Sequence, residues 1–504
     1  MKINRYSIIL VASMALAGSI FFYTYNSTVE LVIVHTNDHH GYCWSTNNVG
    51  GFAKEMTLLK KIRKENKNVL VLSAGDVNSG APESDLNKAE PSFKGMNLLG
   101  FDAMTVGNHD FDNSLTMLRE QEAWSQFPFL AANVYDKTEQ KRLFTPYLIK
   151  VIDDLKVGIF GLTTSDTAFL TDPKNVQNIE FKNEIAEGKH IVNELKKNGV
   201  PFVIALTHIG YYPDEQNGSH GPGDVTLARA APEINVIVGG HTHTLLEKPD
   251  KINETLIVQA HEYAKYMGEL RLKIRKRDGK ILNSEFILHK LDESIAEDPV
   301  MVAFLAPHLE KAQKLTKEPV GSTSTFLDGV RQNVRKKETN FGNLVTDVFR
   351  EIARADVAIQ NGGGIRAPIE QGEITFGDIL QAFPFNNTVV SMELTGEELL
   401  GILQKSASLP RDGTAGGFLQ ISGAKVLIKG NEVLRVDING KPLDPKKRYL
   451  VATNSFTANG GDGYDALKDK PRLDTGYTIA ATLRRHILAK REVSPKVEGR
   501  IVIY

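Results

Sequence analysis

The chain has 504 residues, with 60 Lys and Arg against 61 Asp and Glu, so its formal net charge is −1. That balance gives no support to a protein that coats nucleic acid or another polyanion. Hydrophobic residues make up 41% and charged residues 24%, which excludes a disordered chain and a multi-span membrane protein. The single cysteine, Cys43, excludes an intrachain disulfide and a cysteine metal cluster, and we expect it to be a small buried residue.

The first predicted element is an export signal at the N-terminus. Lys2 and Arg5 precede an apolar run from Ile8 to about Tyr25, and this order is typical of a secretory signal or a signal-anchor. The run approaches the roughly 18–20 residues that span a bilayer, so residues 8–25 are also a candidate membrane tether. We assign residues 1–28 to this segment, cleaved or retained, and expect an extracytoplasmic protein, periplasmic or at the cell surface.

Short apolar runs alternate with longer amphipathic stretches from Glu30 to about Leu291. Runs rich in Val, Ile and Leu suit strands that are buried on both faces. Candidate helices lie between them, at Phe52–Glu65 and Glu184–Asn198, so residues 29–297 are predicted to form a layered α/β domain. The predicted strands are Leu31–Val34, Val69–Leu72, Ala103–Val106, Val157–Phe160, Phe202–Leu206, Val236–Val238 and Leu256–Val258.

A helical linker is predicted at residues 298–318. Asp298 followed by Pro299 is typical of a helix start, and apolar residues follow at helical spacing. Pro307 predicts a kink or an interruption in this helix. Residues 319–504 have their own strands and many turns that contain glycine, which indicates a second, smaller α/β domain.

Polar side chains follow five of the predicted strands at the point where each strand ends. In open α/β sheets, sites form outside the carboxyl ends of the strands, so we expect these side chains to converge. Imidazole and carboxylate ligands without thiolate suit Zn, Mn, Fe or Co. There are too many ligands for one tetrahedral ion, which favours two ions about 3.5–4 Å apart, bridged by a carboxylate such as that of Asp76. The segments are His35-Thr36-Asn37-Asp38-His39-His40, Gly75-Asp76, Gly107-Asn108-His109-Asp110-Phe111-Asp112, Thr207-His208 and Gly239-Gly240-His241-Thr242-His243.

Two ions at that spacing suit displacement at phosphorus, because they lower the pKa of a bound water and neutralise phosphoryl oxygens. His109 adjoins the ligand candidate Asn108, and neighbours on a turn do not easily bind the same ion. We therefore assign His109 to stabilising the transition state, with Asp112 orienting it and favouring its protonated form. The alternative for Asp112 is a helix N-cap, because residues 113–115 can open a helix.

Three further histidines near these segments are assigned to core or supporting roles. His39 is expected to point away from His40 in an extended segment. His35 is set aside with it, and His261 follows a strand without a partner motif.

These five segments, in this order, resemble the sequence blocks of the dinuclear metallophosphoesterases. Asn361-Gly362-Gly363-Gly364-Ile365-Arg366, Pro384-Phe385 and Asn459-Gly460-Gly461-Asp462-Gly463 extend the likeness into the second half. Together they resemble the 5′-nucleotidase family, most closely its bacterial periplasmic UDP-sugar hydrolase branch, particularly over Gly75–Leu86 and Ala89–Asp112. The resemblance begins at about residue 30 and implies a calcineurin-like N-terminal domain joined by a helical linker to a smaller α/β nucleotide-binding domain.

The resemblance also implies a role for individual positions. The family's metal ligands fall on Asp38, His40, Asp76, Asn108, His208, His241 and His243, and its catalytic pair on His109 and Asp112. The substrate-binding positions are two aromatic rings that hold the base (Phe385, Phe456), three arginines that contact phosphate or ribose (Arg331, Arg335, Arg366), a ribose-binding acid (Asp462) and a base-contacting residue (Asn361). Thr242-His243 stands where the branch carries Ser-Gln, and Asn361 where it carries Ser.

The implied function is a two-metal phosphohydrolase that acts on nucleoside 5′-monophosphates and on the diphosphate of UDP-sugars. Its cofactors would be two divalent ions, Zn, Mn or Co, and its partners nucleotides and UDP-sugars. The family rotates its C-terminal domain, which makes residues 298–317 a candidate hinge. The sequence leaves open the preferred base and sugar, the native metal and the oligomeric state.

Two other functions share features of this sequence. A 2′,3′-cyclic nucleotide 2′-phosphodiesterase with 3′-nucleotidase activity has the same metal blocks, but the likeness over Gly75–Leu86 and Ala89–Asp112 favours the first function. A nucleotide-binding protein that has lost catalysis is the third hypothesis. The presence of all seven ligand positions, together with His109 and Asp112, argues against it.

Overall fold

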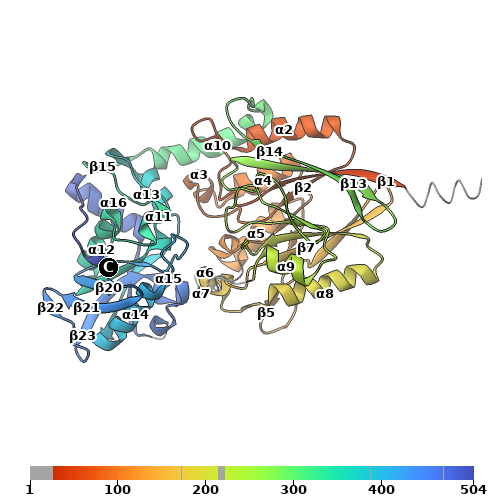
Figure 1. The fold of residues 1–504 in the computed structure, drawn as a ribbon. Coiled ribbons are helices and arrows are strands. Elements are labelled where there is room, and N and C mark those ends of the chain that lie inside the picture. Colours follow the sequence, from red (N-terminus) through yellow and green to blue (C-terminus); the bar gives the residue numbers. More distant parts are fainter. Residues whose placement is uncertain (1–26, 172, 214–221, 386, 469) are drawn as a thin grey trace, which may run out of the picture.

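A computed structural model describes residues 27–504 except residues 172, 214–221, 386 and 469. The predicted export segment, with the candidate tether at residues 8–25, lies outside this range. Within the described part of the chain, none of the helices combines the length and apolarity that crossing a bilayer requires. Two lobes are joined by helix α10 (Pro299–Thr316) (Figure 1).

The N-terminal lobe contains two six-stranded sheets that pack face to face. Their strand orders are β14-β13-β1-β2-β3-β4 and β11-β12-β10-β9-β7-β6. The strands that lead into the predicted ligand segments run parallel to one another within each sheet. In the first sheet β1 is parallel to β2 and β2 to β3, and in the second sheet β9 is parallel to β10. The first sheet comprises β1 (Thr28–Thr36), β2 (Val69–Ser73), β3 (Ala103–Thr105), β4 (Phe129–Leu130), β13 (Tyr266–Arg275) and β14 (Ile281–Lys290). The second comprises β6 (Tyr147–Ile152), β7 (Leu155–Thr163), β9 (Phe202–His208), β10 (Val236–Val238), β11 (Asp250–Ile252) and β12 (Thr255–Val258).

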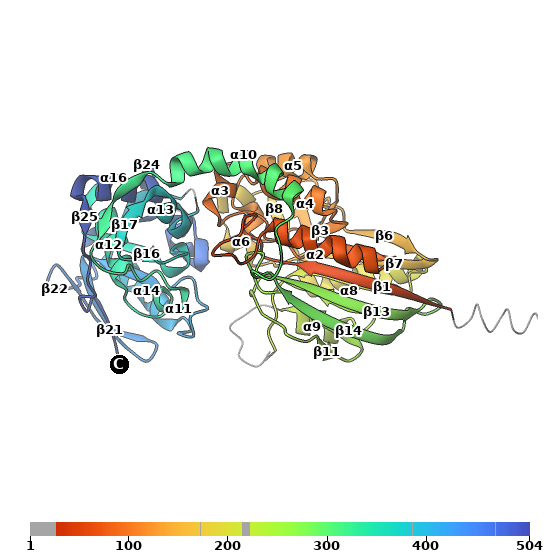
Figure 2. The same cartoon turned by 90° about the horizontal axis from the view of Figure 1, so that it is seen from above.

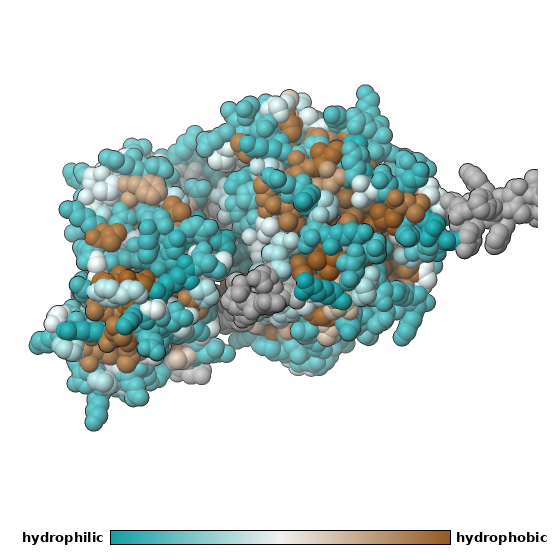
Figure 3. Space-filling view, in the orientation of Figure 1, coloured by the Kyte–Doolittle hydropathy of each residue, from teal (hydrophilic) through white to brown (hydrophobic). Residues whose placement is uncertain are grey.

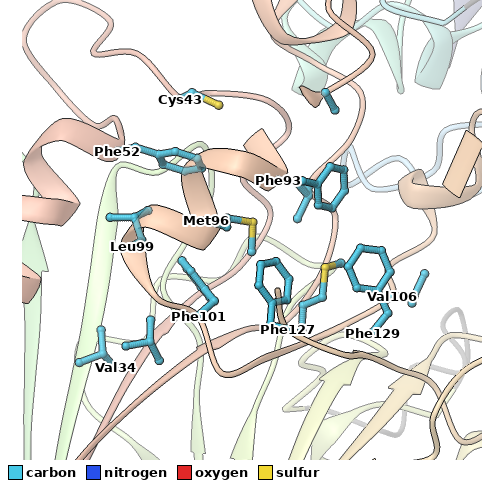
Figure 4. Close-up of a cluster of buried hydrophobic side chains, with 14 of the residues drawn as sticks. Val34, Cys43, Phe52, Phe93, Met96, Leu99, Phe101, Val106, Phe127 and Phe129 are labelled. Carbon is cyan, nitrogen blue, oxygen red and sulfur yellow. The ribbon is translucent and has the colours of Figure 1, made fainter. Parts of the chain in front are cut away.

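Helices cover the outer faces of both sheets, which gives four layers (Figure 2). On the first sheet, α2 (Phe52–Glu65), α4 (Glu90–Leu99) and α5 (Leu115–Trp124) form a core rich in aromatic rings (Figure 4). On the second sheet lie α8 (Glu184–Lys197) and α9 (Asp224–Ala230). A separate apolar cluster fills the space between the sheets.

The layered α/β prediction is confirmed. All seven apolar runs overlap observed strands, and both candidate helices are present. Cys43 is buried, as expected.

The C-terminal lobe is a smaller α/β domain built on three sheets. Their strand orders are β19-β16-β23-β18-β24, β22-β21-β20-β26 and β17-β15-β25. Helices α12 (Asn340–Ala353), α13 (Phe376–Ala382), α14 (Gly396–Ser408) and α16 (Ile479–Lys490) pack on them over two apolar clusters. The strands of the largest sheet are β16 (Val357–Asn361), β18 (Thr388–Thr395), β19 (Leu419–Ser422), β23 (Arg448–Asn454) and β24 (Arg472–Thr478). The others are β15 (Pro319–Thr323), β17 (Gly372–Thr375), β20 (Ala424–Lys429), β21 (Glu432–Ile438), β22 (Lys441–Pro442), β25 (Glu492–Val493) and β26 (Ile501–Ile503).

Helix α10 continues through Pro307, where the sequence predicts a kink or an interruption. Asp298 Oδ1 accepts a hydrogen bond from the N–H of Val300 at 3.0 Å and so caps the first turn. Met301 and Leu305 are buried in the core of the N-terminal lobe. This packing offsets the backbone hydrogen bond that Pro307 cannot donate. The helix also contacts α13 of the other lobe. Figure 3 shows that this face of the protein is largely hydrophilic with separate apolar patches.

The contact between the two N-terminal sheets is tight at Gly161 in β7. A Cβ atom there would lie 2.2 Å from the carbonyl oxygen of Leu130 in β4. We expect Gly161→Ala to lower the free energy of unfolding by about 1–3 kcal/mol, because overpacking forces the backbones apart. At Gly401 in α14 an added Cβ would meet no described atom within 4 Å. Gly401→Ala should therefore raise the free energy of unfolding by about 0.5–1 kcal/mol. Urea denaturation measures both, and a Gly161→Ala variant as stable as the wild type would contradict this packing.

Candidate functional site

The predicted ligand residues lie on the turns that follow β1, β2, β3 and β10 and at the last residue of β9. Five of them have a φ between 48° and 81°, a region that L-residues seldom occupy and that costs energy. Each such residue bends the chain sharply, so that side chains from different strands turn toward one point. The five residues are Asp38, His40, Asp76, His241 and His243.

Asp38, His40 and His243 form the first group of metal-ligand atoms. The Nε2 atoms of His40 and His243 are 3.2 Å apart, and His243 Nε2 is 3.3 Å from Asp38 Oδ1. One ligand atom from each residue lies within 4.8 Å of the others. Asp38 and His40 are buried, and His243 is partly buried.

A second group lies beside the first and shares carboxylates with it. His208 Nε2 is 3.0 Å from Asp76 Oδ2 and 3.2 Å from Asn108 Oδ1, and His241 Nδ1 is 2.8 Å from the same Asn108 oxygen. Asp76 Oδ2 also lies 3.8 Å from His40 Nε2. The structure therefore brings all seven predicted ligand positions together, with Asp76 between the two groups.

The Nδ1 protons of two imidazole rings are assigned by their hydrogen-bond partners. His208 Nδ1 lies 2.7 Å from the carbonyl oxygen of Ala74, and His40 Nδ1 lies 2.8 Å from that of Ser79. A carbonyl oxygen only accepts, so each Nδ1 carries a proton, and in its neutral form each ring would point an Nε2 lone pair inward. The Nδ1 of His243 is in ion-pair contact with the Glu262 carboxylate, which likewise turns its Nε2 inward.

These inward lone pairs face carboxylate and amide oxygens, which also carry lone pairs. The arrangement is repulsive unless a proton or a cation lies between the atoms. Imidazole nitrogen, carboxylate oxygen and amide oxygen are ligands of divalent Zn, Mn and Co. The residues present therefore fit two divalent cations that share a carboxylate.

The charge of buried Asp76 and that of buried His208 depend on each other. Burial alone would raise the pKa of Asp76, yet the imidazoles of His208, His109 and His40 hold it well below its usual range. Burial alone would lower the pKa of His208, but Asp76 and Asp38 raise it to about 10. A proton thus satisfies this pair in the absence of metal, and metal binding would release it.

His109 and Asp112 form a second functional element beside the ligand groups. His109 Nδ1 donates to Asp112 Oδ2 at 2.7 Å, and Asp112 Oδ1 accepts from Thr171 Oγ1 at 3.1 Å. The N–H of His109 donates to Asp76 Oδ1 at 2.8 Å, which ties this pair to the ligand groups. Asp112 is not the N-cap of α5, because Ser114 fills that position.

A cavity of about 690 Å³ opens between the lobes. The N-terminal lobe contributes Asp76, Asn108, His109, Asp112, His241 and His243, and the C-terminal lobe contributes Arg331, Arg335, Asn361, Arg366, Phe385, Phe456 and Asp462. The structure thus gathers every predicted substrate-binding residue at the same cavity as the predicted catalytic pair, His109 and Asp112. The Phe385 ring stacks on the His109 ring at 5.7 Å, so the two lobes meet at that histidine.

The arginines give one wall of this cavity a positive charge. Burial lowers the pKa of Arg335 well below its usual range, and the neighbouring guanidinium groups of Arg331 and Arg366 lower it further. Arg335 Nη1 donates to the carbonyl oxygen of Thr414 at 2.9 Å, whereas its buried Nε has no hydrogen-bond partner among the described residues. Guanidinium groups held this close favour an anionic ligand between them.

Asn361 is held within the protein rather than free in the cavity. Its Nδ2 donates to Asp462 Oδ2 at 2.7 Å, and its Oδ1 accepts from Asn454 Nδ2 at 2.9 Å. Phe456 lies against Gly461, where an added Cβ would come within 2.5 Å of the ring. A glycine is needed there for the ring to keep its place beside Asp462.

The structure adds two functional residues that the sequence patterns do not single out. Glu262 contacts His243, and buried Asp110 accepts hydrogen bonds from the backbone N–H groups of Gly107, Val77 and Asn78 at 2.8–3.2 Å. Asp110 thereby fixes the turns that carry Asp76 and Asn108. Asp110 could have been found from the sequence, because it lies within the ligand segment at residues 107–112. Glu262 had no such indication beyond its position next to His261.

The three histidines set aside in the sequence do not belong to the ligand groups. His39 Nε2 is 3.2 Å from Glu55 Oε1 in the buried core, and His35 stacks on Phe286 with ring centres 6.0 Å apart. His261 Nδ1 lies 3.0 Å from the carbonyl oxygen of His243 and so supports the turn behind that ligand.

Comparison with known protein families agrees with this geometry. Residues 31–245 match the calcineurin-like phosphoesterase family, and residues 319–469 match the 5′-nucleotidase C-terminal domain family. The chain therefore belongs to the 5′-nucleotidase family of calcineurin-like metallophosphoesterases.

Individual relatives cover almost the whole chain. Protein UshA of Escherichia coli is 39% identical over 508 residues, which span 92% of each protein. The 5′-nucleotidase of Vibrio cholerae is 38% identical over 510 residues, 93% of this chain and 92% of that one. The crystal structure of a 5′-nucleotidase precursor from Thermus thermophilus superposes with a TM-score of 0.84 at 32% identity, covering 94% of this chain and 99% of that one.

The lone-pair arrangement predicts that bound cations stabilise the fold. We expect chelation to lower the melting temperature and Mn²⁺ to restore it, because each ion at 1,000 times its Kd adds about 4 kcal/mol. Asp76→Asn removes the shared carboxylate and should abolish most of the Mn²⁺ response. Differential scanning calorimetry with and without metal measures this, and identical melting curves for the stripped and loaded wild type would contradict it.

Proposed function

We propose that the protein is a two-metal phosphohydrolase that dephosphorylates nucleoside 5′-monophosphates and cleaves the diphosphate of UDP-sugars. The observation that supports this most directly is the shared cavity, in which the cation-binding groups of one lobe face the guanidinium and aromatic groups of the other. A nucleotide has the matching halves, a phosphate for the first set and a nucleoside for the second.

The proposed ligand sets follow the two groups of the structure. Asp38, His40 and His243 would hold one ion, Asn108, His208 and His241 the other, with Asp76 shared. When bound, two divalent ions of this kind, Zn, Mn or Co, supply a nucleophilic water and neutralise charge on phosphoryl oxygens.

The catalytic pair acts on the phosphate through hydrogen bonding. His109 donates from Nδ1 to Asp112, which leaves its Nε2 for the substrate. Thr171 fixes Asp112 from the far side, so the imidazole keeps its orientation as charge develops on the phosphoryl group. A protonated His109 would stabilise that charge and can also supply a proton to the leaving oxygen.

The C-terminal lobe would bind the rest of the substrate. We assign Arg331, Arg335 and Arg366 to phosphate and ribose, because clustered guanidinium groups favour an anion. Phe385 and Phe456 would stack on the base, an interaction worth about 1–3 kcal/mol that tolerates different bases. Asp462 would accept hydrogen bonds from the ribose hydroxyls.

Proposed domain limits are 29–297 and 319–504, with residues 298–318 as the linker and residues 298–317 as the candidate hinge. The assignment of residues 1–28 to export, and hence an extracytoplasmic location, rests on the basic residues and apolar run of that segment.

Phosphate release from AMP, UDP-glucose and 2′,3′-cyclic AMP tests the proposed function. UDP-glucose assays include a phosphatase that acts on sugar phosphates, because cleavage of the diphosphate releases no free phosphate. The metal-stripped protein receives Mn²⁺, Co²⁺ or Zn²⁺ separately. We expect metal-dependent turnover of AMP and UDP-glucose, and a loss of about 10²- to 10⁴-fold in kcat for His109→Ala. His190→Ala, at an exposed histidine of α8, is the matched control.

The other outcomes separate the alternatives. Turnover of the cyclic substrate alone would assign the chain to the 2′,3′-cyclic nucleotide phosphodiesterases. Nucleotide binding without turnover with any metal would assign it to the inactive nucleotide-binding proteins. Wild-type activity in the His109→Ala variant would contradict the catalytic role of that histidine.

Asn361 positions the proposed ribose-binding carboxylate, and this has a measurable consequence. Asn361→Asp would place two carboxylates side by side and remove the donor to Asp462. We expect the KM for AMP to rise about tenfold, equivalent to about 1.4 kcal/mol, with a smaller change in kcat. Asn361→Ser replaces the amide donor to Asp462 by a shorter hydroxyl without adding a charge and should cost less. Equal KM values for the three proteins would contradict this role.

A further inference from the structure

Glu262 lies on the segment after β12 and joins the proposed metal centre to a lysine. Its Oε2 contacts Nδ1 of His243, and its Oε1 accepts from Lys265 Nζ at 3.3 Å. Both carboxylate oxygens of Glu262 are therefore engaged.

The segment around Glu262 is shaped to fit the ligand groups. His261, Tyr263 and Ala264 have φ values of 63°, 60° and 51°, so the chain makes a sharp turn there. The N–H of Tyr263 donates to the carbonyl oxygen of Asp38 at 2.8 Å. The Tyr263 ring also packs edge-on against the rings of His40 and His243, with centres 5.6 and 5.8 Å apart. This packing places Glu262 behind His243 and leaves the ring little room to rotate.

We propose that Glu262 is a positioning residue that fixes the tautomer and orientation of His243, so that Nε2 faces the cation held with Asp38 and His40. A neutral imidazole has two tautomers, and only the one with its proton on Nδ1 presents an Nε2 lone pair to the metal. A carboxylate on Nδ1 selects that tautomer and increases the basicity of the ligand nitrogen. The inference rests on the metal centre of the proposed function.

The position of His243 explains why this chain needs such a partner. An amide side chain at this position would bind a cation through its oxygen without any choice of tautomer. Imidazole gains a stronger donor atom but has to be held in one protonation pattern. Glu262 supplies that constraint, and it acts on one of the two ions because it reaches the centre through His243.

The experiment is a titration of the metal-stripped full chain with Mn²⁺, followed by isothermal calorimetry. We expect the wild type to bind two ions and Glu262→Gln to bind one of them 10- to 100-fold more weakly, with the other Kd unchanged. Glu269→Gln is the matched control. Buried Glu269 pairs with His289 Nε2 at 2.7 Å on β13 and β14, and its loss should leave both Kd values unchanged.

A double-mutant cycle separates positioning from a general effect on the fold. In a His243→Gln background there is no imidazole to orient, so adding Glu262→Gln should change the weaker Kd by no more than about twofold. The melting temperature of each metal-free variant shows whether it is folded before the titration.

The outcomes also distinguish this inference from the proposed function. Equal Kd values for the wild type and Glu262→Gln would overturn the positioning role while leaving the two-metal centre in place. Equal weakening of both ions, or the same loss from Glu262→Gln in the His243→Gln background, would show a merely structural role and overturn it too. A wild type that binds fewer than two ions would overturn the metal centre itself, and this inference with it.

Discussion

The candidate metal centre of the N-terminal lobe depends on three imidazole rings whose Nδ1 atoms point away from the centre. Ala74, Ser79 and Glu262 hold those rings, and the inward Nε2 lone pairs meet the carboxylates of Asp38 and Asp76. Such a concentration of electron pairs in a buried space is unfavourable without positive charge. The strained turns at the strand ends and the network around Asp110 keep this arrangement in place, which the fold tolerates because cations can relieve it.

The two lobes divide the chemistry of a nucleotide between them. One lobe concentrates carboxylates and imidazoles, and the other presents guanidinium groups, aromatic rings and an acid at the same cavity. Phe385 stacks on His109, and Gln381 donates to the Tyr42 hydroxyl at 3.3 Å, so contacts between the lobes lie next to the proposed catalytic pair. Among the described residues that line the cavity, the candidate metal ligands come from one lobe and the arginines from the other, which makes the relative position of the lobes part of the site.

Sequence patterns predicted the features that depend on local order along the chain. Buried strands appear as short apolar runs, and a ligand at the end of a strand is adjacent to that run, so Asp38, Asp76 and His208 could be recognised before their distances were known. Glu262 could not, because its role depends on a contact with His243 across two loops. For Pro307 the local pattern predicted a kink or an interruption that the structure does not have. The local effect of this proline on α10 is outweighed by the packing of that helix. The substrate-binding side chains were indicated by family resemblance rather than by any pattern of their own.

The most direct test of the two-cation centre is anomalous X-ray diffraction from crystals of the full chain soaked with Mn²⁺, measured at the manganese absorption edge. We expect two peaks about 3.5–4 Å apart, one beside His40 and His243 and one beside His208 and His241, with Asp76 between them. A single peak, or two peaks too far apart to share a carboxylate, would contradict it.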